Sequence, residues 1–193
     1  MALLALRDAN LLAGFYLAGG TGLALQFGHR LSRDLDFFSQ ELFGEEALLQ
    51  RLTALGDLSV SSKDRATLHA TVLGTKTSFI EYTYPLLYPT KNYLEVAVAD
   101  ARDIACMKLS AIAGRGAKRD FVDLYFCARN YGLKEMLALF ERKFAQTHFS
   151  RIHLLKSLTY FADAEKDPMP HMLEALDWNT VKQFFMLEVP RLV

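Results

Sequence analysis

The sequence predicts an α+β protein, in which a mixed, mainly antiparallel sheet flanked by helices is followed by a helical bundle. Residues 57–99 are rich in β-branched and aromatic side chains, in runs that Gly74, Pro85 and Pro89 interrupt. From residue 100 onward the apolar residues recur with helical spacing. We therefore expect an α/β core over residues 1–99 and a helical domain over residues 100–193 that packs on it.

Length and composition are those of an ordinary globular protein. The chain has 193 residues, 51% of them hydrophobic, which is enough for one core or for a compact core with a smaller appended domain. The 22 basic residues balance 22 acidic ones, so no overall field draws the chain to nucleic acid or to an anionic membrane. Binding to RNA would need a local basic patch.

Three features that mark other classes of protein are weak here. Cys106 and Cys127 lie in apolar helical patterns without a zinc-ligand partner, so we expect reduced core residues in a cytoplasmic protein. The five histidines are scattered and predict no metal site. Residues 11–27 carry no charge, but their four glycines favour a strand, a turn and a short helix over a membrane-spanning helix.

The remaining elements are predicted from periodicity. Residues 44–55 have acids in the first turn and a leucine stripe, which is typical of an amphipathic helix covering a sheet face. Three or four strands should follow between residues 57 and 99, with a turn at Leu73-Gly74. Helices are expected at residues 2–13, 100–114, 117–130, 133–146, 149–163 and 179–188.

A glycine-rich turn, Gly19-Gly20-Thr21-Gly22, separates a predicted strand at 15–18 from a predicted helix at 23–27. Glycines let the backbone approach an anion, a helix N-terminus offers unpaired N–H groups, and Thr21 adds a hydroxyl. The turn is therefore a candidate phosphate site. A turn without a ligand is the alternative.

Two acids, Asp34 and Asp36, follow in a segment whose apolar members favour a strand. Side chains two residues apart on a strand share a face, with their Cα atoms about 6.5 Å apart. From there the carboxylates can converge on a pair of Mg²⁺ ions about 4 Å apart. A solvated loop or a helix cap is the alternative.

The order of these parts is more specific than either part alone. Gly19-Gly20, thirteen further residues and then Asp34-Leu35-Asp36 resemble the signature of the polymerase-β-like nucleotidyltransferase superfamily. The wider stretch GGTGLALQFGHRLSRDLDFF is similar to the AbiEii/AbiGii toxin family of nucleotidyltransferases. The resemblance implies the polymerase-β-like fold, two Mg²⁺ ions (or Mn²⁺), and transfer of a nucleoside monophosphate from an NTP to a hydroxyl with release of pyrophosphate.

Glu81 is a lone acid in a predicted apolar strand, between Ile80 and Tyr82. In the superfamily a third metal-site carboxylate lies on the strand beside the Asp-x-Asp strand. The resemblance therefore implies that Glu81 binds metal or takes the proton of the attacking hydroxyl. An edge-strand acid that faces solvent is the alternative.

A local basic patch lies at residues 102–119, with five basic side chains and one acid. Lys108 emerges there from a mainly apolar helix, and a buried ammonium needs an anion, such as a triphosphate. Asp120 and Asp123, on the next predicted helix, either hold nearby cations in place or are ordinary capping and surface charges.

The stretch from Asp103 to Phe126 is similar to the later motifs of the same family, in which a lysine and a following aspartate belong to the active site. These correspond to Lys108 and to either Asp120 or Asp123. The resemblance then implies that the helical domain completes the active site. In this interpretation Arg30 and Lys108 neutralise the triphosphate, and Ser32 donates to a phosphate or caps the turn. Replacing Lys108 with alanine should weaken triphosphate use without unfolding the chain.

The resemblance also implies partners. The acceptor would be RNA, particularly tRNA ends, and a cognate antitoxin protein would oppose the toxin. A small molecule or a protein hydroxyl as acceptor stays open, as does a catalytically weak module that binds nucleotide or a partner protein. No membrane partner is expected.

Overall fold

The computed structural model describes residues 2–192 and confirms the α+β architecture. Contacts within the chain define two units. The first unit comprises residues 2–22, 32–85 and 89–100, and the second comprises residues 23–31, 86–88 and 101–192. The division falls within helix α2 (Gly19–Phe27), so the second unit includes a short segment from the N-terminal half of the sequence.

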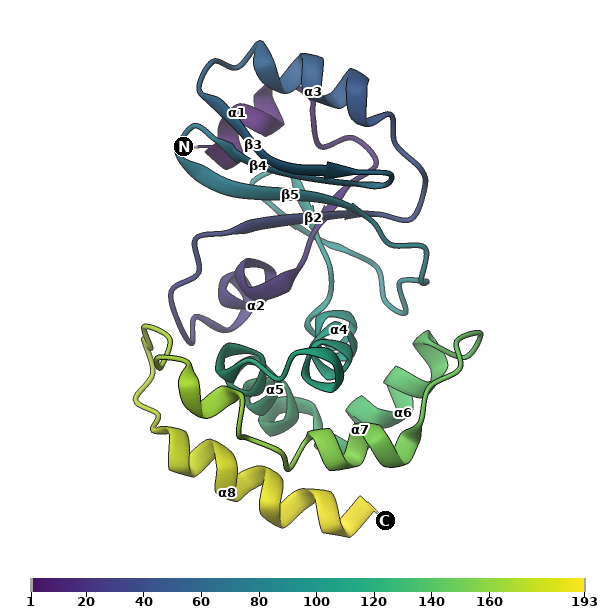
Figure 1. Ribbon diagram of the computed structural model, residues 1–193, viewed down its shortest axis with the longest axis vertical. Helices are drawn as coiled ribbons and strands as arrows, with labels where there is room; N and C mark the ends of the chain where they lie inside the picture. Colours follow the sequence, from purple (N-terminus) through teal and green to yellow (C-terminus); the bar gives the residue numbers. More distant parts are fainter. Residues whose placement is uncertain (1, 193) are drawn as a thin grey trace. The chain divides into compact units, whose positions relative to one another are not determined.

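A seven-stranded mixed sheet in the order β3-β4-β5-β2-β1-β7-β6 forms the centre of the first unit (Figure 1). Strand β2 pairs antiparallel with β1 and parallel with β5, and β1 pairs parallel with β7. The strands are β1 (Tyr16–Leu17), β2 (Leu35–Ser39), β3 (Leu58–Asp64), β4 (Thr67–Val72), β5 (Thr75–Glu81), β6 (Lys91–Tyr93) and β7 (Val96–Val98).

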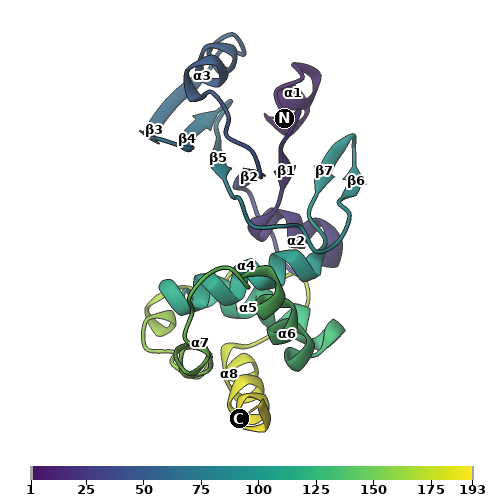
Figure 2. The ribbon, with the colours of Figure 1, turned by 90° about the vertical axis from the view of Figure 1, so that its right-hand side faces the viewer.

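The strand-rich segment contains five strands within the described residues, one more than the upper limit expected from the sequence. The prediction was wrong because β6 and β7 are only three residues long, too short for a repeating pattern to be recognised. Figure 2 shows these two strands next to β1, at one edge of the sheet. The hairpin turn at Leu73-Gly74 is confirmed. Both turn residues have positive φ, 48° and 73°, as a two-residue hairpin turn requires.

Helices α1 (Ala2–Asp8) and α3 (Glu45–Thr53) lie on the same side of this sheet (Figure 1). The amphipathic helix is confirmed, with Leu48 and Leu52 buried. The guanidinium of Arg51 donates to the carbonyls of Ala9 and Asn10, at 2.9 and 2.8 Å, and so ties α3 to the segment after α1. Helix α1 ends earlier than predicted because Asn10 adopts a left-handed backbone conformation, φ 52°.

The uncharged run at residues 11–27 forms β1, a turn and α2, as predicted. Among the described residues, no helix has both the length and the apolar character needed to cross a bilayer.

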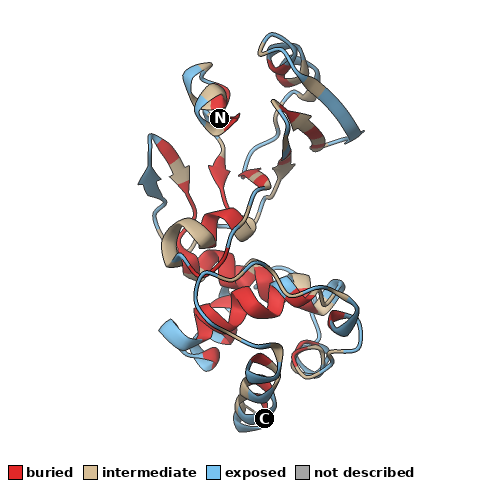
Figure 3. Ribbon diagram, turned by 90° about the vertical axis from the view of Figure 1, so that its left-hand side faces the viewer, coloured by how far each residue is buried: buried red, intermediate tan, exposed pale blue. Residues whose placement is uncertain are grey.

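The second unit is helical, and helices α4 and α5 hold most of its buried side chains (Figure 3). Cys106 and Cys127 are free and buried in these helices. The main helices are α4 (Ala101–Gly114), α5 (Lys118–Tyr131), α6 (Leu133–Lys143), α7 (Arg151–Ser157) and α8 (Trp178–Glu188), with short 3-10 turns η1 (Ala164–Lys166) and η2 (Val189–Leu192).

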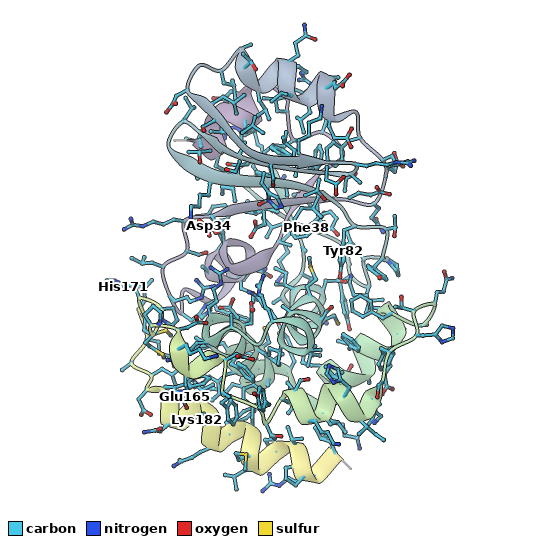
Figure 4. All side chains as sticks on the ribbon, viewed as in Figure 1. Asp34, Phe38, Tyr82, Glu165, His171 and Lys182 are labelled. Atoms are coloured by element: carbon cyan, nitrogen blue, oxygen red, sulfur yellow. The ribbon has the colours of Figure 1, made fainter. Side chains whose placement is uncertain are left out.

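The helix predicted at 149–163 is wrong in extent, since α7 ends at Ser157. The Ser157 hydroxyl donates to the carbonyl of His153, at 2.9 Å. Side-chain hydrogen bonds of this kind compete with the backbone hydrogen bonds of a helix and so favour its end. The chain then continues through turns to η1, where Glu165 accepts from Lys182 of α8 at 2.7 Å (Figure 4).

The core of the first unit depends on Phe37 of β2 and Phe79 of β5, which are fully buried and stack with ring centroids 5.4 Å apart. Replacing Phe79 with alanine should lower the free energy of unfolding by about 3 to 5 kcal/mol, because it leaves a cavity between paired strands. Chemical denaturation measures the change. Val60→Ala, on the exposed edge strand β3, is the control and should have little effect; equal losses from both variants would contradict this description of the core.

Candidate active site

The Asp-x-Asp segment lies at and just before the start of β2. Asp36 is within the strand, Asp34 precedes it by one residue, and both side chains are half-exposed, whereas Leu35 and Phe37 are buried. Figure 4 shows Asp34 at this strand and Phe38 beside Tyr82, whose ring centroids are 5.5 Å apart. The predicted strand is confirmed with Asp36 on it and with Leu35 and Phe37 buried on its other face, whereas Asp34 lies just outside the strand.

The glycine turn approaches Asp36 closely. Gly19 begins α2 with φ +61°, and a Cβ at this position would lie 2.8 Å from Asp36 Oδ2, closer than real Cβ contacts. The preceding residue, Ala18, donates its backbone N–H to the carbonyl of Asp36 at 3.0 Å. The strand pairing of β1 with β2 therefore puts the predicted turn against the predicted carboxylate, with glycine required at the point of contact.

Thr21 holds the segment that leads to the acids. Its buried hydroxyl donates to the backbone carbonyl of Asp34 and lies 2.9 Å from the hydroxyl of Ser32. Both hydroxyls that the sequence offered to phosphate are thus engaged in fixing the loop between α2 and β2. Of the two expectations for Ser32, this contact matches the turn-stabilising one.

Glu81 lies on β5, the parallel neighbour of β2, but the strand register separates it from Asp36. Asp36 pairs with Ser78, whereas Glu81 pairs with Ser39, three residues further along. Side chains alternate between faces along a strand, so Glu81 shares a face with Ser39 and Phe37, opposite to that of Asp36. The structure thus brings Ser78, rather than Glu81, beside Asp36.

The two acids suit a divalent cation as oxygen ligands, and Mg²⁺ is commonly held by one or two carboxylates together with substrate phosphates. Within the described residues, no group of three or more histidine, cysteine, aspartate or glutamate side chains could hold a metal ion. Asp34 and Asp36 thus fit a metal that a nucleotide helps to bind, rather than one that the protein encloses.

In the second unit, Lys108, Asp120 and Asp123 lie together in the interior. Lys108 Nζ is 2.9 Å from Asp120 Oδ1 and 2.7 Å from Asp123 Oδ2, and all three side chains are buried. Arg115 also binds Asp120, at 2.8 and 3.0 Å. The anions that Lys108 requires are therefore Asp120 and Asp123, which lie three residues apart on one face of α5.

Asp123 has two further partners from the segment after α2. Arg30 makes a bidentate contact, with Nε at 2.6 Å and Nη2 at 2.8 Å, and His29 Nε2 lies 2.8 Å from the same carboxylate. Backbone hydrogen bonds to residues 171–174 fix this segment: Leu31 donates to the carbonyl of His171 at 2.9 Å (Figure 4). Arg30, expected at the triphosphate, is thus bound to a carboxylate.

His29 did not emerge from the sequence as a site residue, because it has no partner at a helical or metal-ligand spacing. Its partner lies 94 positions further along the chain. Since an ionised carboxylate only accepts, Nε2 carries the proton, and the buried Nδ1 has no hydrogen-bond partner among the described residues. The sequence offered one indirect indication: a buried arginine needs an acid as partner, so burial of Arg30 would imply an acid near His29 as well.

Electrostatics favour the charged forms of Lys108, Asp120 and Asp123. Burial opposes ionisation of Asp123, but the Lys108 ammonium and the hydrogen bonds from Arg30 and His29 outweigh it and hold the Asp123 pKa below its usual range. The pKa of Asp120 is lowered in the same way, against burial, by Lys108 and Arg115. Burial acts to lower the pKa of Lys108, yet Asp123 and Asp120 raise it overall.

Comparison with solved structures shows which known proteins share this fold. The fold is similar to that of MenT4, a nucleotidyltransferase toxin from Mycobacterium tuberculosis H37Rv, with a TM-score of 0.58 and 17% identity over 99% of this chain and 84% of that chain. JHP933 from Helicobacter pylori gives a TM-score of 0.56 and 20% identity, over 99% and 91%. ANT(2'')-Ia in complex with adenylyl-2''-tobramycin gives 0.57 and 13%, over 76% and 95%. These likenesses establish a nucleotidyltransferase fold.

Sequence comparison gives the family. The model of the nucleotidyl transferase AbiEii toxin family, type IV toxin–antitoxin system, matches residues 2–85 and 68–191. An uncharacterized protein from Aquifex aeolicus (strain VF5) is 41% identical over 183 residues, covering 91% of this chain and 86% of that protein. The chain belongs to the AbiEii family of nucleotidyltransferase toxins, which confirms the resemblance seen in its motifs and the enzyme class.

The buried ion pairs of Lys108 predict that its replacement destabilises the fold, whereas the sequence predicted an intact fold. Lys108→Met leaves two carboxylates without their shared cation, so the free energy of unfolding should fall by about 3 to 5 kcal/mol. Lys166→Met is the matched control, because Lys166 pairs with Asp163 on the surface and exposed pairs contribute little. Denaturant titration compares the two variants.

The same variant has a pH signature. The unfolded chain protonates its aspartates as the pH falls below about 4, whereas Asp120 and Asp123 resist protonation in the folded state. The stability that they contribute is present above the unfolded pKa and lost as the pH falls through the folded pKa. Wild type should therefore lose stability between pH 5 and pH 3 more steeply than Lys108→Met; equal slopes would contradict the ion-pair assignment.

Proposed function

We propose that this nucleotidyltransferase moves a nucleoside monophosphate from an NTP to a hydroxyl of RNA, with tRNA as the first candidate acceptor. The family, a toxin of a type IV toxin–antitoxin system, supports a nucleic-acid acceptor and a cognate antitoxin that opposes the activity. The chain has no net charge, so electrostatic attraction to RNA must come from local groups; of the basic residues in 102–119, Lys108 and Lys118 are buried, and Arg115 and Arg119 are exposed.

The observation that carries the proposal is the contact between the glycine turn and Asp36. In it, the N-terminus of α2 and a half-exposed carboxylate lie at one place, with Asp34 one residue before the strand. The N–H groups of the first turn, at Gly19 and Gly20, have no acceptor within the helix and would bind the phosphates. Asp34 and Asp36 would hold Mg²⁺, which supplies charge neutralisation at the triphosphate when bound.

The roles of the other predicted residues follow from their partners. Thr21 and Ser32 hold the loop that carries Asp34 and so position this acid. Arg30, Lys108, Asp120 and Asp123 lie buried in the second unit, and we propose that the reaction depends on their charge as well as on the stability that they give.

The acceptor has one serious alternative, a small molecule. ANT(2'')-Ia, whose fold is similar, is described in complex with an adenylylated tobramycin. A protein hydroxyl and a module that only binds nucleotide are the other candidates. A labelled NTP distinguishes these candidates, because the label is transferred to RNA, to a small molecule, to protein or to none of them.

The test incubates the protein with Mg²⁺, each α-labelled NTP in turn and total tRNA, and follows label into RNA, protein and small molecules. Label in RNA is expected, dependent on Mg²⁺. Asp36→Asn and Asp34→Asn should each lower the rate by at least about a hundredfold, since charge neutralisation carries most of this chemistry. No transfer from any NTP to any acceptor would overturn the proposal.

The rate of Glu81→Gln, compared with that of Asp36→Asn, tests whether Glu81 is a third carboxylate of the site. Because Glu81 stands on the opposite face from Asp36, we expect this variant to keep its rate within a few-fold of wild type. A loss as large as that of Asp36→Asn would restore the third-carboxylate role that the resemblance implied.

Gly19→Ala tests the close approach itself. Its Cβ would collide with Asp36 Oδ2, so transfer should fall by at least about tenfold. Gly14→Ala is the matched control, since Gly14 also has positive φ, +82°, but no atom lies within 4 Å of its Cβ position. Both variants have backbone strain of about 1 to 2 kcal/mol, and only Gly19→Ala should lose activity beyond its loss of stability. Equal activity in the two variants would show that the contact is not functional.

A further inference from the structure

A row of polar side chains crosses the half-exposed face of the sheet at the level of Asp36. Asp36 of β2 pairs with Ser78 of β5, Ser78 pairs with His69 of β4, and His69 pairs with Ser62 of β3. Directly paired residues on neighbouring strands share a face. All four side chains therefore stand on the face that carries the proposed metal-binding carboxylate.

Ser78 and His69 are in contact within this row. His69 Nδ1 lies 3.0 Å from Ser78 Oγ, and both residues are partly exposed. The residues on either side of His69, Leu68 and Ala70, are buried on the opposite face. In the tautomer with the ring proton on Nε2, the Ser78 hydroxyl donates to Nδ1, and the lone pairs of the serine oxygen are left for another donor.

The pair of Ser78 and His69 lies beside Asp36, where the reaction needs a group that accepts a proton. Attack by a hydroxyl requires a group that takes its proton. The strand register turns Glu81 to the other face, and the residue directly beside Asp36 on β5 is Ser78. A serine alone is a poor proton acceptor, but a serine hydrogen-bonded to an imidazole can pass its own proton to the ring as it takes up another.

We infer that Ser78 and His69 together accept the proton of the hydroxyl that attacks the nucleotide, an inference that rests on the proposed function. The acceptor O–H bond breaks as its oxygen bonds to the α-phosphorus, and the bond from that phosphorus to the pyrophosphate oxygen breaks. The pyrophosphate leaves with the bonding electrons. The hydroxyl proton goes to Ser78 Oγ, the serine proton goes to His69 Nδ1, and the imidazolium then releases one proton to solvent.

In this assignment Ser78 is the catalytic residue, because its oxygen touches the substrate hydroxyl. His69 acts through Ser78 and is a positioning residue that also stores the proton. Neither emerged from the sequence, because both lie outside the two motif blocks and the histidine and serine are nine positions apart.

The test uses the full chain with Mg²⁺, labelled NTP and total tRNA, and compares Ser78→Ala, His69→Ala and Thr71→Ala. Thr71 is the matched control, because it lies two residues from His69 on β4, shares its face and is equally half-buried. The first two variants should lower kcat by about a hundredfold while the KM for NTP stays within about twofold. Thr71→Ala should match wild type.

Chemical rescue separates proton transfer from a structural role. Added imidazole should restore the kcat of His69→Ala by at least tenfold and leave Ser78→Ala and Thr71→Ala unchanged. The inference is overturned if His69→Ala keeps kcat within threefold of wild type, or if imidazole fails to restore it. In either case an active wild type leaves the proposed function standing, whereas a wild type that transfers no label to RNA, protein or small molecules removes both.

Discussion

The position of β2 between β1 and β5 is the constraint on which the first unit depends. Its antiparallel pairing with β1 brings Asp36 against Gly19, and its parallel pairing with β5 sets Ser78 beside the same carboxylate. A shift of one residue in either register would turn the acid into the core and bring Phe37 out. The stacked pair Phe37 and Phe79 opposes such a shift. The same strand register is therefore needed to pack the core and to position Asp36.

The second unit is organised around a buried carboxylate in a comparable way. Asp123 is surrounded by Lys108 of α4 and by the adjacent residues His29 and Arg30, so its partners come from two separate parts of the chain. Removing such charges from water is costly, and their mutual contacts offset that cost only when every partner is present. The network therefore specifies one arrangement of α4, α5 and the segment after α2, and it makes these residues difficult to replace singly.

Much of the candidate site could be predicted because its chemistry is local. Gly19-Gly20 and Asp34-Leu35-Asp36 each need only a turn or a strand of a few residues to take their shape, and the sequence contains both the turn chemistry and the alternation. The extents of α1 and α7 were less predictable, because single residues such as Asn10 ended a helix against its apolar pattern.

By itself, the sequence determined the α+β order, the family and the two motif blocks, since composition, periodicity and motif spacing are properties of neighbouring residues. Only the tertiary structure decided which side chains meet. Strand register directs Glu81 away from Asp36 and places Ser78 and His69 on the face of this acid, and chain segments far apart supply the partners of Asp123. The physical reason is that pairing register and burial of charge depend on contacts between distant residues, which no local pattern records.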